Sequence, residues 1–358
     1  MTLSSYTVEL SGLRMRAAMF HGPENIVITE KKITKGIHDA VIKVDACAVC
    51  GYDARVYRNG HKKVKPPLVL GHEICGMTLQ DINTGYGTIR SGSRVAVSPV
   101  IPCLSCEFCN KRQYNLCNNL REIGSTDDGG FAEYVKIPQQ IIKSGGLVQI
   151  PDNLKSEEGA LLEPLACCLN GFEHLKIEPE SSVLIIGDGP IGLLHLEISK
   201  KLYQAKVAVV GKIASRIQCA RSNGADGVFM FDDETEDEVM NFTDGKGANT
   251  VIVATGNPEA LEFATKIASK NSTINIFSGF PNNNNFFIDP NWLHYNQISI
   301  TGSFSSTPQM LQNATKLASE GKINLSRVIS HRYSLDNIEQ AILDTEGFRG
   351  LRVIIDKF

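Results

Sequence analysis

The sequence lacks the features that mark membrane-spanning, secreted and nucleic-acid-binding proteins. No stretch of the 358-residue chain approaches the ~18 uninterrupted apolar residues of a spanning helix. The first twenty residues contain charged side chains and no long apolar region, so we expect no signal peptide and a cytoplasmic protein. A formal net charge of -3 gives no positive surplus to attract nucleic acid or anionic membranes. We therefore expect neither of these as partners.

The length and a change in the pattern of predicted elements indicate two domains, because 358 residues exceed the usual ~100–200 residues of one domain. Residues from about 15 to 160 form short runs between Gly and Pro, such as 40–45 and 93–98, which favours a β-rich domain. From residue 182 apolar strands alternate with helix-length segments, which indicates a parallel sheet covered on both faces. The last fifty residues end in an apolar strand, which we expect to rejoin the first domain. The expected elements of the second part are strands at 183–186, 207–210, 227–231, 250–254 and 273–277 and a helix at 191–202.

Four of the ten cysteines lie in one 15-residue window, spaced Cys103-x2-Cys106-x2-Cys109-x7-Cys117. Thiolates at this spacing can converge on one tetrahedral ion, and a site closed by four thiolates is structural rather than catalytic. The alternative is two disulfides or scattered free thiols, which a reducing compartment disfavours. The window therefore predicts a structural zinc site.

A glycine-rich turn follows the apolar strand at 183–186 and opens the helix. This is the context that a dinucleotide-binding turn requires, although a simple glycine-rich turn is the alternative. The first glycine permits the tight turn, the second lets a pyrophosphate approach the backbone, and the third lets the helix pack closely on the strand. The helix N-terminus adds amides and a positive dipole. The expected cofactor-binding residues here are Gly187, Gly189, Pro190, Ile191 and Gly192.

The end of the next strand favours NADP(H) over NAD(H). An NAD enzyme usually places Asp or Glu there, to bind the adenosine ribose 2′-OH. This chain has Gly211 and Lys212 instead, with Arg216 four residues later. A glycine leaves room for a 2′-phosphate and two cations attract it. The alternative is that these are exposed basic residues at a helix start.

A second group of residues that can bind a metal lies outside the cysteine window. It comprises Cys50, the pair His72 and Glu73, and Glu163. A zinc ion that takes part in chemistry keeps about three protein ligands and leaves a position for water or substrate. Each residue alone is a weak signal, but together with the cysteine window and the glycine turn they are specific.

With these motifs in this order, the chain resembles the zinc-containing medium-chain dehydrogenase/reductase family from about residue 15 to the C-terminus. The segment Glu-Pro-Leu-Ala at 163–166 is similar to the polyol (sorbitol-type) and threonine dehydrogenase branch. Simple alcohol dehydrogenases of the family place a cysteine ligand near this point, and Cys167 and Cys168 keep that alternative open.

The resemblance implies an α/β fold in two parts. A GroES-like β-rich catalytic domain would comprise residues 1–162 and 303–358, with a structural zinc lobe at about 100–120. A doubly wound Rossmann domain with a parallel sheet would comprise residues 163–302 and bind the cofactor. The family's usual assembly implies a homodimer or homotetramer.

The resemblance also implies two zinc ions per chain and assigns the second one its ligands. Cys50 and His72 would bind the catalytic zinc, and Glu73 would be the third ligand. Glu163 would either bind directly or hold the zinc-bound water. Asp53 would orient His72, since a metal-bound histidine normally donates its other N–H to such an acceptor.

Two residues depart from the family pattern. Tyr52 occupies the place of the Ser or Thr hydroxyl that passes the substrate proton, and a phenol can also donate and accept. Arg55 occupies the place of the outer histidine of the proton relay, where a guanidinium cannot shuttle protons. It would instead hold a polar or anionic substrate group, or simply face solvent.

The expected activity is hydride transfer between NADP(H) and a secondary hydroxyl of a small-molecule polyol, sugar or cyclitol. One alternative is a simple alcohol or threonine dehydrogenase. A second alternative is a non-catalytic NADPH-binding protein, which the departures at Tyr52 and Arg55 would suit. The intact set of Cys50, His72, Glu73 and Glu163 favours an enzyme.

Overall fold

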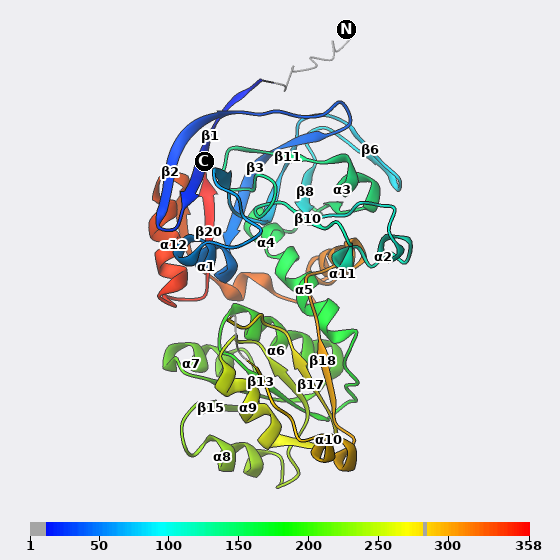
Figure 1. The fold of residues 1–358 in the computed structure, drawn as a ribbon, viewed down its shortest axis with the longest axis vertical. Helices are drawn as coiled ribbons and strands as arrows, with labels where there is room; N and C mark the ends of the chain where they lie inside the picture. The colour runs from blue at the N-terminus through cyan, green and yellow to red at the C-terminus, as the bar shows by residue number, and fades with distance from the viewer. Residues whose placement is uncertain (1–11, 282–284) are drawn as a thin grey trace. The chain divides into compact units, whose positions relative to one another are not determined.

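A computed structural model describes residues 12–281 and 285–358, and the structural statements below concern these residues. The chain forms two compact units, each shown in Figure 1. Unit 1 comprises Met1–Ala166, Ser306–Glu320 and Asn324–Phe358, and unit 2 comprises Cys167–Ser305 and Gly321–Ile323. The expectation of no signal peptide concerns a segment whose first eleven residues lie outside this description. Within the described residues, no helix combines the length and the apolar character needed to cross a bilayer.

Unit 1 is built on a seven-stranded sheet with the order β12-β8-β5-β3-β20-β19, in which β11 also pairs with β3. Its centre is β3 (Ala40–Val49), a strand whose residues are almost all buried. The last strand of the chain, β20 (Arg352–Lys357), pairs antiparallel with β3, so that Val353 lies opposite Val49 (Figure 1). The C-terminal end of the chain is therefore part of the same sheet as residues 40–49.

The other strands of unit 1 are short and separated by turns, as the spacing of Gly and Pro predicts. They are β1 (Arg14–Gly22), β2 (Asn25–Lys32), β4 (Leu68–Val69), β5 (Glu73–Thr78), β6 (Ile82–Thr84), β7 (Gly87–Ile89), β8 (Arg94–Val97), β9 (Val100–Ile101), β10 (Arg121–Glu122), β11 (Tyr134–Ile137), β12 (Leu147–Gln149) and β19 (Ile329–Ser334). The helices are α1 (Gly51–Asn59), α2 (Glu107–Asn110), α3 (Gln139–Ser144), α4 (Ser156–Ala160), α11 (Pro308–Ser319) and α12 (Ile338–Glu346). Helix α5 (Leu162–Phe172) begins in unit 1 and ends in unit 2.

Unit 2 is a six-stranded parallel sheet with the order β15-β14-β13-β16-β17-β18. This is the strand order of a doubly wound dinucleotide-binding sheet. The expectation of a parallel sheet is confirmed, because every neighbouring pair of strands in this sheet is parallel. The strands are β13 (Ser182–Ile186), β14 (Lys206–Gly211), β15 (Gly227–Met230), β16 (Ala248–Val253), β17 (Ala268–Ile276) and β18 (Ser299–Gly302). The helices are α6 (Pro190–Tyr203), α7 (Ala214–Ser222), α8 (Thr235–Phe242), α9 (Pro258–Ile267) and α10 (Pro290–Asn296).

Candidate metal centres and cofactor site

The four cysteines of the window converge in space. Their sulfur atoms all lie within 4.8 Å of one another, with Cys103 3.9 Å from Cys109 and Cys106 4.0 Å from Cys117. Four sulfurs bound to one zinc at about 2.3 Å lie about 3.8 Å apart, so this spacing fits a tetrahedral ion. A disulfide would bring two sulfurs to about 2 Å, and all ten cysteines are free. The disulfide alternative is therefore wrong.

Local hydrogen bonds prepare two of these thiols for a cation. The hydroxyl and backbone of Ser105 donate to Cys103 and lower its pKa to about 5. Backbone N–H groups, that of Cys109 first, lower the pKa of Cys106. Burial has the opposite effect on the other two, raising the pKa of Cys109 to about 12 and that of Cys117 above its ordinary value. Because a metal ligand is a thiolate, a bound ion would supply the positive charge that the buried pair lacks.

A second group forms where β3 meets α1. Cys50 is the single residue between them and caps the start of α1, and Glu73 begins β5, with His72 just before it. The ligand atoms of these three residues lie within 4.8 Å of one another, close to the spacing of ligands around a single zinc ion. Three ligands rather than four leave a position open. The donor set of one thiol, one imidazole and one carboxylate therefore fits the catalytic type of zinc site.

Asp53 lies beside Cys50 and His72 and helps to hold these two residues in place. Its carboxylate is fully buried, accepts a hydrogen bond from the Cys50 N–H at 2.9 Å and lies 3.5 Å from His72 Nδ1. Burial by itself would lower the pKa of His72, but the Asp53 carboxylate and the Cys50 thiol raise it well above its ordinary value. The site thus favours positive charge between Cys50 and His72, and Asp53 holds the imidazole by its second nitrogen.

Glu73 has a buried cationic partner, Arg352, that no sequence motif indicated. Its Oε1 lies 3.3 Å from Nη1 of Arg352 on β20, and both side chains are at most 5% exposed. The other carboxylate oxygen, Oε2, is buried and makes no hydrogen bond within the described residues. Burial would lower the pKa of Arg352, but Glu73, Cys50 and Glu163 together raise it. Arg352 therefore anchors one oxygen of Glu73 and leaves the other available to an ion.

The remaining predicted ligand does not join the three. Neither metal-capable group in the described part of the chain includes Glu163, Cys167 or Cys168. Glu163 is buried in the first turn of α5 and acts on Arg352 through its charge. The group whose ligand atoms all lie within 4.8 Å of one another thus consists of Cys50, His72 and Glu73, without Glu163.

Tyr52 lies beside this group and carries a chain of hydrogen bonds. Its hydroxyl is 2.8 Å from Ser125 Oγ and 3.4 Å from His61 Nδ1, and its ring contacts the His72 ring edge-on. Burial raises the pKa of Tyr52, which keeps its hydroxyl protonated near neutral pH. Burial, together with Lys63, Lys62 and Arg55, lowers the pKa of His61, against the opposing charge of Glu122. Arg55 itself is exposed.

The glycine turn of unit 2 has the shape of a cofactor cradle. Gly187 has a φ of +133°, in the region that favours glycine. A Cβ on Gly192 would lie 1.9 Å from the Gly187 carbonyl oxygen, so α6 can pack this closely only without one. A Cβ on Gly189 would meet nothing nearer than Arg216 Nη1 at 3.9 Å, which leaves its backbone open to a phosphate. Pro190 and Ile191 form the first turn of α6, as expected.

The residues expected to clamp a 2′-phosphate all have acidic neighbours. Lys212 Nζ lies 3.0 Å from Glu259 Oε2, and Arg216 Nη1 lies 4.0 Å from Asp188 Oδ1. Arg216 is only 7% exposed, so it is not the surface residue that the alternative assumed. Gly211 adjoins the Asp188 side chain, which lies within 2.5 Å of where a Cβ at position 211 would be. The room beside Gly211, expected to receive a phosphate, is thus occupied by the carboxylate of Asp188.

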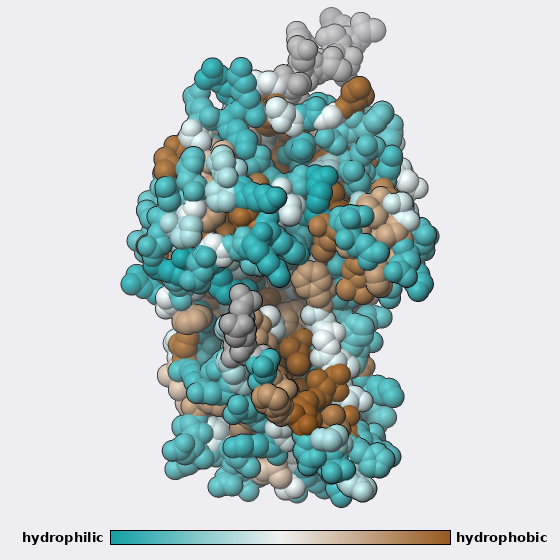
Figure 2. All heavy atoms as spheres, in the orientation of Figure 1, coloured by the Kyte–Doolittle hydropathy of each residue, from teal (hydrophilic) through white to brown (hydrophobic). Residues whose placement is uncertain are grey.

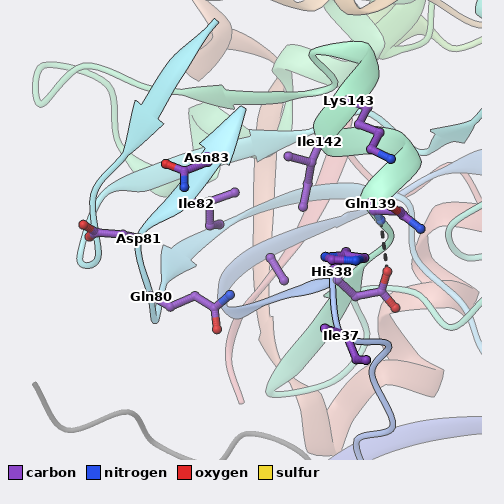
Figure 3. Close-up of a pocket in the computed structure, with 11 residues that line it drawn as sticks. Ile37, His38, Gln80, Asp81, Ile82, Asn83, Gln139, Ile142 and Lys143 are labelled. Atoms are coloured by element: carbon purple, nitrogen blue, oxygen red, sulfur yellow. Dashed lines mark hydrogen bonds between the residues drawn. The ribbon is translucent and has the colours of Figure 1, made fainter. Parts of the chain in front are cut away.

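A separate hollow of about 420 Å³ lies in unit 1, between the segment before β3, β6 and α3 (Figure 3). Asp39 holds one wall of it by accepting a hydrogen bond from the Gln139 N–H at 3.0 Å. Asp81 and Lys143 also line it. No residue that the sequence predicted to be catalytic or cofactor-binding lines this hollow.

Comparison with known protein families matches both units. The "Alcohol dehydrogenase GroES-like domain" family matches residues 36–152 and the "Zinc-binding dehydrogenase" family matches residues 190–320. Sorbitol dehydrogenase of Bacillus subtilis is 29% identical over 334 residues, which cover 92% of each chain. L-threonine 3-dehydrogenase of Pyrococcus horikoshii is 30% identical over 335 residues, 91% of this chain and 93% of that protein.

Two solved structures are similar over nearly the whole chain and differ in their cofactor. A zinc-binding dehydrogenase from Sinorhizobium meliloti bound to NADP has a TM-score of 0.87 at 31% identity, covering 96% of this chain and 99% of that one. An alcohol dehydrogenase from Escherichia coli complexed with NADH also has a TM-score of 0.87, at 26% identity, covering 96% and 100%. Proteins similar to this chain in fold thus bind one cofactor or the other.

Proposed function

Because the chain belongs to the zinc-containing medium-chain dehydrogenase/reductase family, in the polyol and threonine dehydrogenase branch, we propose that it transfers hydride between NADP(H) and a secondary hydroxyl of a polyol, sugar or cyclitol. The observation that carries the proposal is the convergence of Cys50, His72 and Glu73 within 4.8 Å, with one oxygen of Glu73 unpartnered among the described residues. A protein that had lost its chemistry would have no reason to keep this open three-ligand set.

In this proposal the two zinc ions have different roles. Cys103, Cys106, Cys109 and Cys117 hold a structural ion, and Cys50, His72 and Glu73 hold the catalytic one. A catalytic zinc supplies a Lewis acid, which lowers the energy of an alkoxide oxygen and polarises a carbonyl. Asp53 keeps His72 in the orientation to bind, and Arg352 does the same for Glu73. Glu163 acts at longer range, through its charge or through a zinc-bound water.

Tyr52 takes over the proton transfer that a Ser or Thr hydroxyl performs in relatives. Its ring contacts His72 and its hydroxyl is linked to Ser125 and His61, so a proton taken from the substrate hydroxyl has a hydrogen-bonded route away from the metal site. His61 then replaces the relay histidine whose place Arg55 occupies. Exposed Arg55 remains available to a polar or anionic group of the substrate.

The cofactor binds at the turn of unit 2. Gly187, Gly189 and Gly192 form the cradle for the pyrophosphate at the start of α6, where the helix dipole favours negative charge. Lys212 and Arg216 support a preference for the 2′-phosphate of NADP(H). The NADP-bound relative from Sinorhizobium meliloti is consistent with this preference.

The test is a zinc count combined with NADPH and NADH oxidation assays on a panel of carbonyl compounds. The panel comprises keto-sugars, cyclitol ketones, simple ketones and 2-amino-3-ketobutyrate, the last because of the threonine dehydrogenase relative. We expect two zinc ions per chain and NADPH-dependent reduction of a hydroxylated ketone. One zinc ion per chain with tight NADPH binding and no turnover would instead indicate a binding protein.

A homodimer is the assembly that unit 2 supports. Strand β18 is the edge of the parallel sheet and pairs only with β17 among the described strands, and an open edge of this kind is a template for pairing with another chain. Apolar side chains gather around it: Tyr295 is 76% exposed and Phe304 49%, and Figure 2 shows hydrophobic residues over the region of β18 and α10. Light scattering should give a molar mass twice the 39.1 kDa of one chain. In Tyr295→Glu the molar mass should fall toward that of a single chain.

A further inference from the structure

The carboxylate of Asp188 lies among hydrogen-bond donors at the end of β14. Asp188 is the variable residue of the glycine turn, between Gly187 and Gly189. Its Oδ2 accepts hydrogen bonds from the backbone N–H groups of Lys212 and Ile213, both at 2.8 Å. Its Oδ1 lies 4.0 Å from Arg216 Nη1, and both side chains are about nine-tenths buried. Two amides and a guanidinium thus surround an internal carboxylate.

The absence of a side chain at Gly211 makes this arrangement possible. A Cβ at position 211 would lie 2.3 Å from Asp188 Oδ2, 2.4 Å from its Cβ and 2.5 Å from its Cγ. These separations are far below van der Waals contact, so a larger residue at 211 and Asp188 in this position exclude one another. The glycine and the carboxylate form one unit, assembled from two neighbouring strands.

The position matters because it is where the adenosine ribose is recognised in this fold. Ligands bind at the carboxyl ends of parallel strands, and the residue ending the second strand contacts the ribose 2′ position. A 2′-phosphate would need the same donors that Asp188 now uses, namely the Lys212 and Ile213 amides and Arg216. A 2′-phosphate and the Asp188 carboxylate that contacted the same donors would lie close together, and in this largely buried place the two negative charges would repel one another. One anion must leave for the other to bind.

We propose that Asp188 is the specificity-determining residue for the adenosine 2′ position, and that it competes with the 2′-phosphate of NADP(H) for the anion site formed by the Lys212 and Ile213 amides and Arg216. This rests on the proposed function, since it assumes that unit 2 binds a nicotinamide dinucleotide. Lys212 and Arg216 attract the phosphate, and Asp188 limits how strongly the protein prefers NADP(H) to NAD(H).

The experiment measures binding of adenosine 2′,5′-bisphosphate and of 5′-AMP to the full-length protein by calorimetry, without any turnover. Asp188→Asn removes the charge but keeps an oxygen that accepts from both amides, and Asp188→Ser is the second variant if the first does not fold. We expect affinity for the bisphosphate to rise about tenfold or more, with 5′-AMP changed by less than about threefold.

Asp226→Asn is the matched control. Asp226 also accepts a backbone hydrogen bond, from the Val207 N–H at 2.7 Å, but at the opposite end of β14. The loss of one negative charge at Asp226 should leave the affinities for the bisphosphate and for 5′-AMP unchanged. Asp226 lies farther than the Debye length of about 8–10 Å from the Asp188 carboxylate, so its charge is largely screened there.

Unchanged or weakened bisphosphate binding in both Asp188 variants, with 5′-AMP still bound, would overturn this inference alone. If the wild-type protein bound neither nucleotide and held no second zinc ion, the proposed function would fail along with it. A rise in bisphosphate affinity in Asp226→Asn equal to that in Asp188→Asn would also overturn it, since net charge and not position would then be the cause.

Discussion

Arg352, on the last strand of the chain, lies 3.3 Å from Glu73 in the candidate metal site, and both side chains are almost fully buried. Removing one partner of such a buried pair strongly destabilises the folded protein, because an uncompensated charge remains in the interior. The pair therefore couples the stability of unit 1 to the position of a metal ligand.

Arg352→Gln should lower the free energy of unfolding by about 3–5 kcal/mol and weaken zinc binding at this site by about 10–100-fold. Arg332→Gln is the control on the neighbouring strand. Arg332 pairs with Glu157 at 2.7 Å but is 50% exposed, so its loss should cost at most about 1 kcal/mol. Urea unfolding and competition with a zinc chelator measure the two effects. Equal losses in the two variants would show that Arg352 has no special role.

The two zinc sites should separate by mutation. His72→Asn should remove one zinc ion per chain and reduce turnover by about a thousandfold or more, with little change in thermal stability. Cys106→Ser should also remove one ion, but its main effect should be a lower melting temperature, because the closed site holds a loop together. Elemental analysis, melting curves and turnover on the same preparations test this. Retention of both ions in either variant would contradict the ligand assignment.

Tyr52→Phe should reduce turnover by about 10²–10⁴-fold while zinc content stays the same, because it removes only the hydroxyl that receives the proton. Tyr57→Phe is the matched control on the same helix. The Tyr57 hydroxyl donates to Glu339 and is not part of the metal site, so its removal should affect stability and not turnover. Turnover in Tyr52→Phe equal to that in Tyr57→Phe would exclude the phenol from proton transfer.

His195 should make unit 2 sensitive to acid. It is fully buried on α6 between Phe172 and Phe277, its ring nitrogens have no hydrogen-bond partner within the described residues, and burial lowers its pKa to about 3. The unfolded chain binds a proton below about pH 6.5 and the folded one does not. The contribution of neutral His195 to the free energy of unfolding is therefore fully present above about pH 6.5, and it is lost as the pH falls toward 3.

His195→Leu removes this dependence. Between pH 7.5 and 5 the wild-type protein should lose about 2 kcal/mol more than the variant, measured as the difference between their urea unfolding free energies at each pH. Other titrating groups cancel in that difference. If the unfolding free energies of the two proteins changed equally with pH, His195 would bind a proton as readily in the folded state as in the unfolded state, contrary to this prediction.

Features set by short sequence spacing could be predicted from the sequence. The four cysteines, the glycine turn and the alternation of strand and helix each depend on neighbours along the chain, and the structure has them as expected. Local spacing limits where such side chains can point, so few alternatives remain.

Partners that are distant in sequence could not be predicted in this way. Arg352 meets Glu73 only through the pairing of β20 with β3, and Ser125 and His61 reach Tyr52 from two different segments. A signal for Arg352 was present, because a charged residue inside an apolar strand must have a buried partner. Asp188 was missed for another reason: it is the variable position of its motif, and its effect depends on the glycine at 211.

The pairing of β20 with β3 also sets an order of events during synthesis. Arg352 donates to the carbonyl of Val49, 303 residues earlier, so these contacts cannot form until β20 has been synthesised. Unit 2 lies almost wholly within Cys167–Ser305, and it can fold while the rest is still being made. Until β20 leaves the ribosome, the Cys47–Val49 segment of β3 has an open edge and Glu73 lacks its cation. A nascent chain stalled before β20 would thus carry a finished nucleotide-binding unit and an immature metal site.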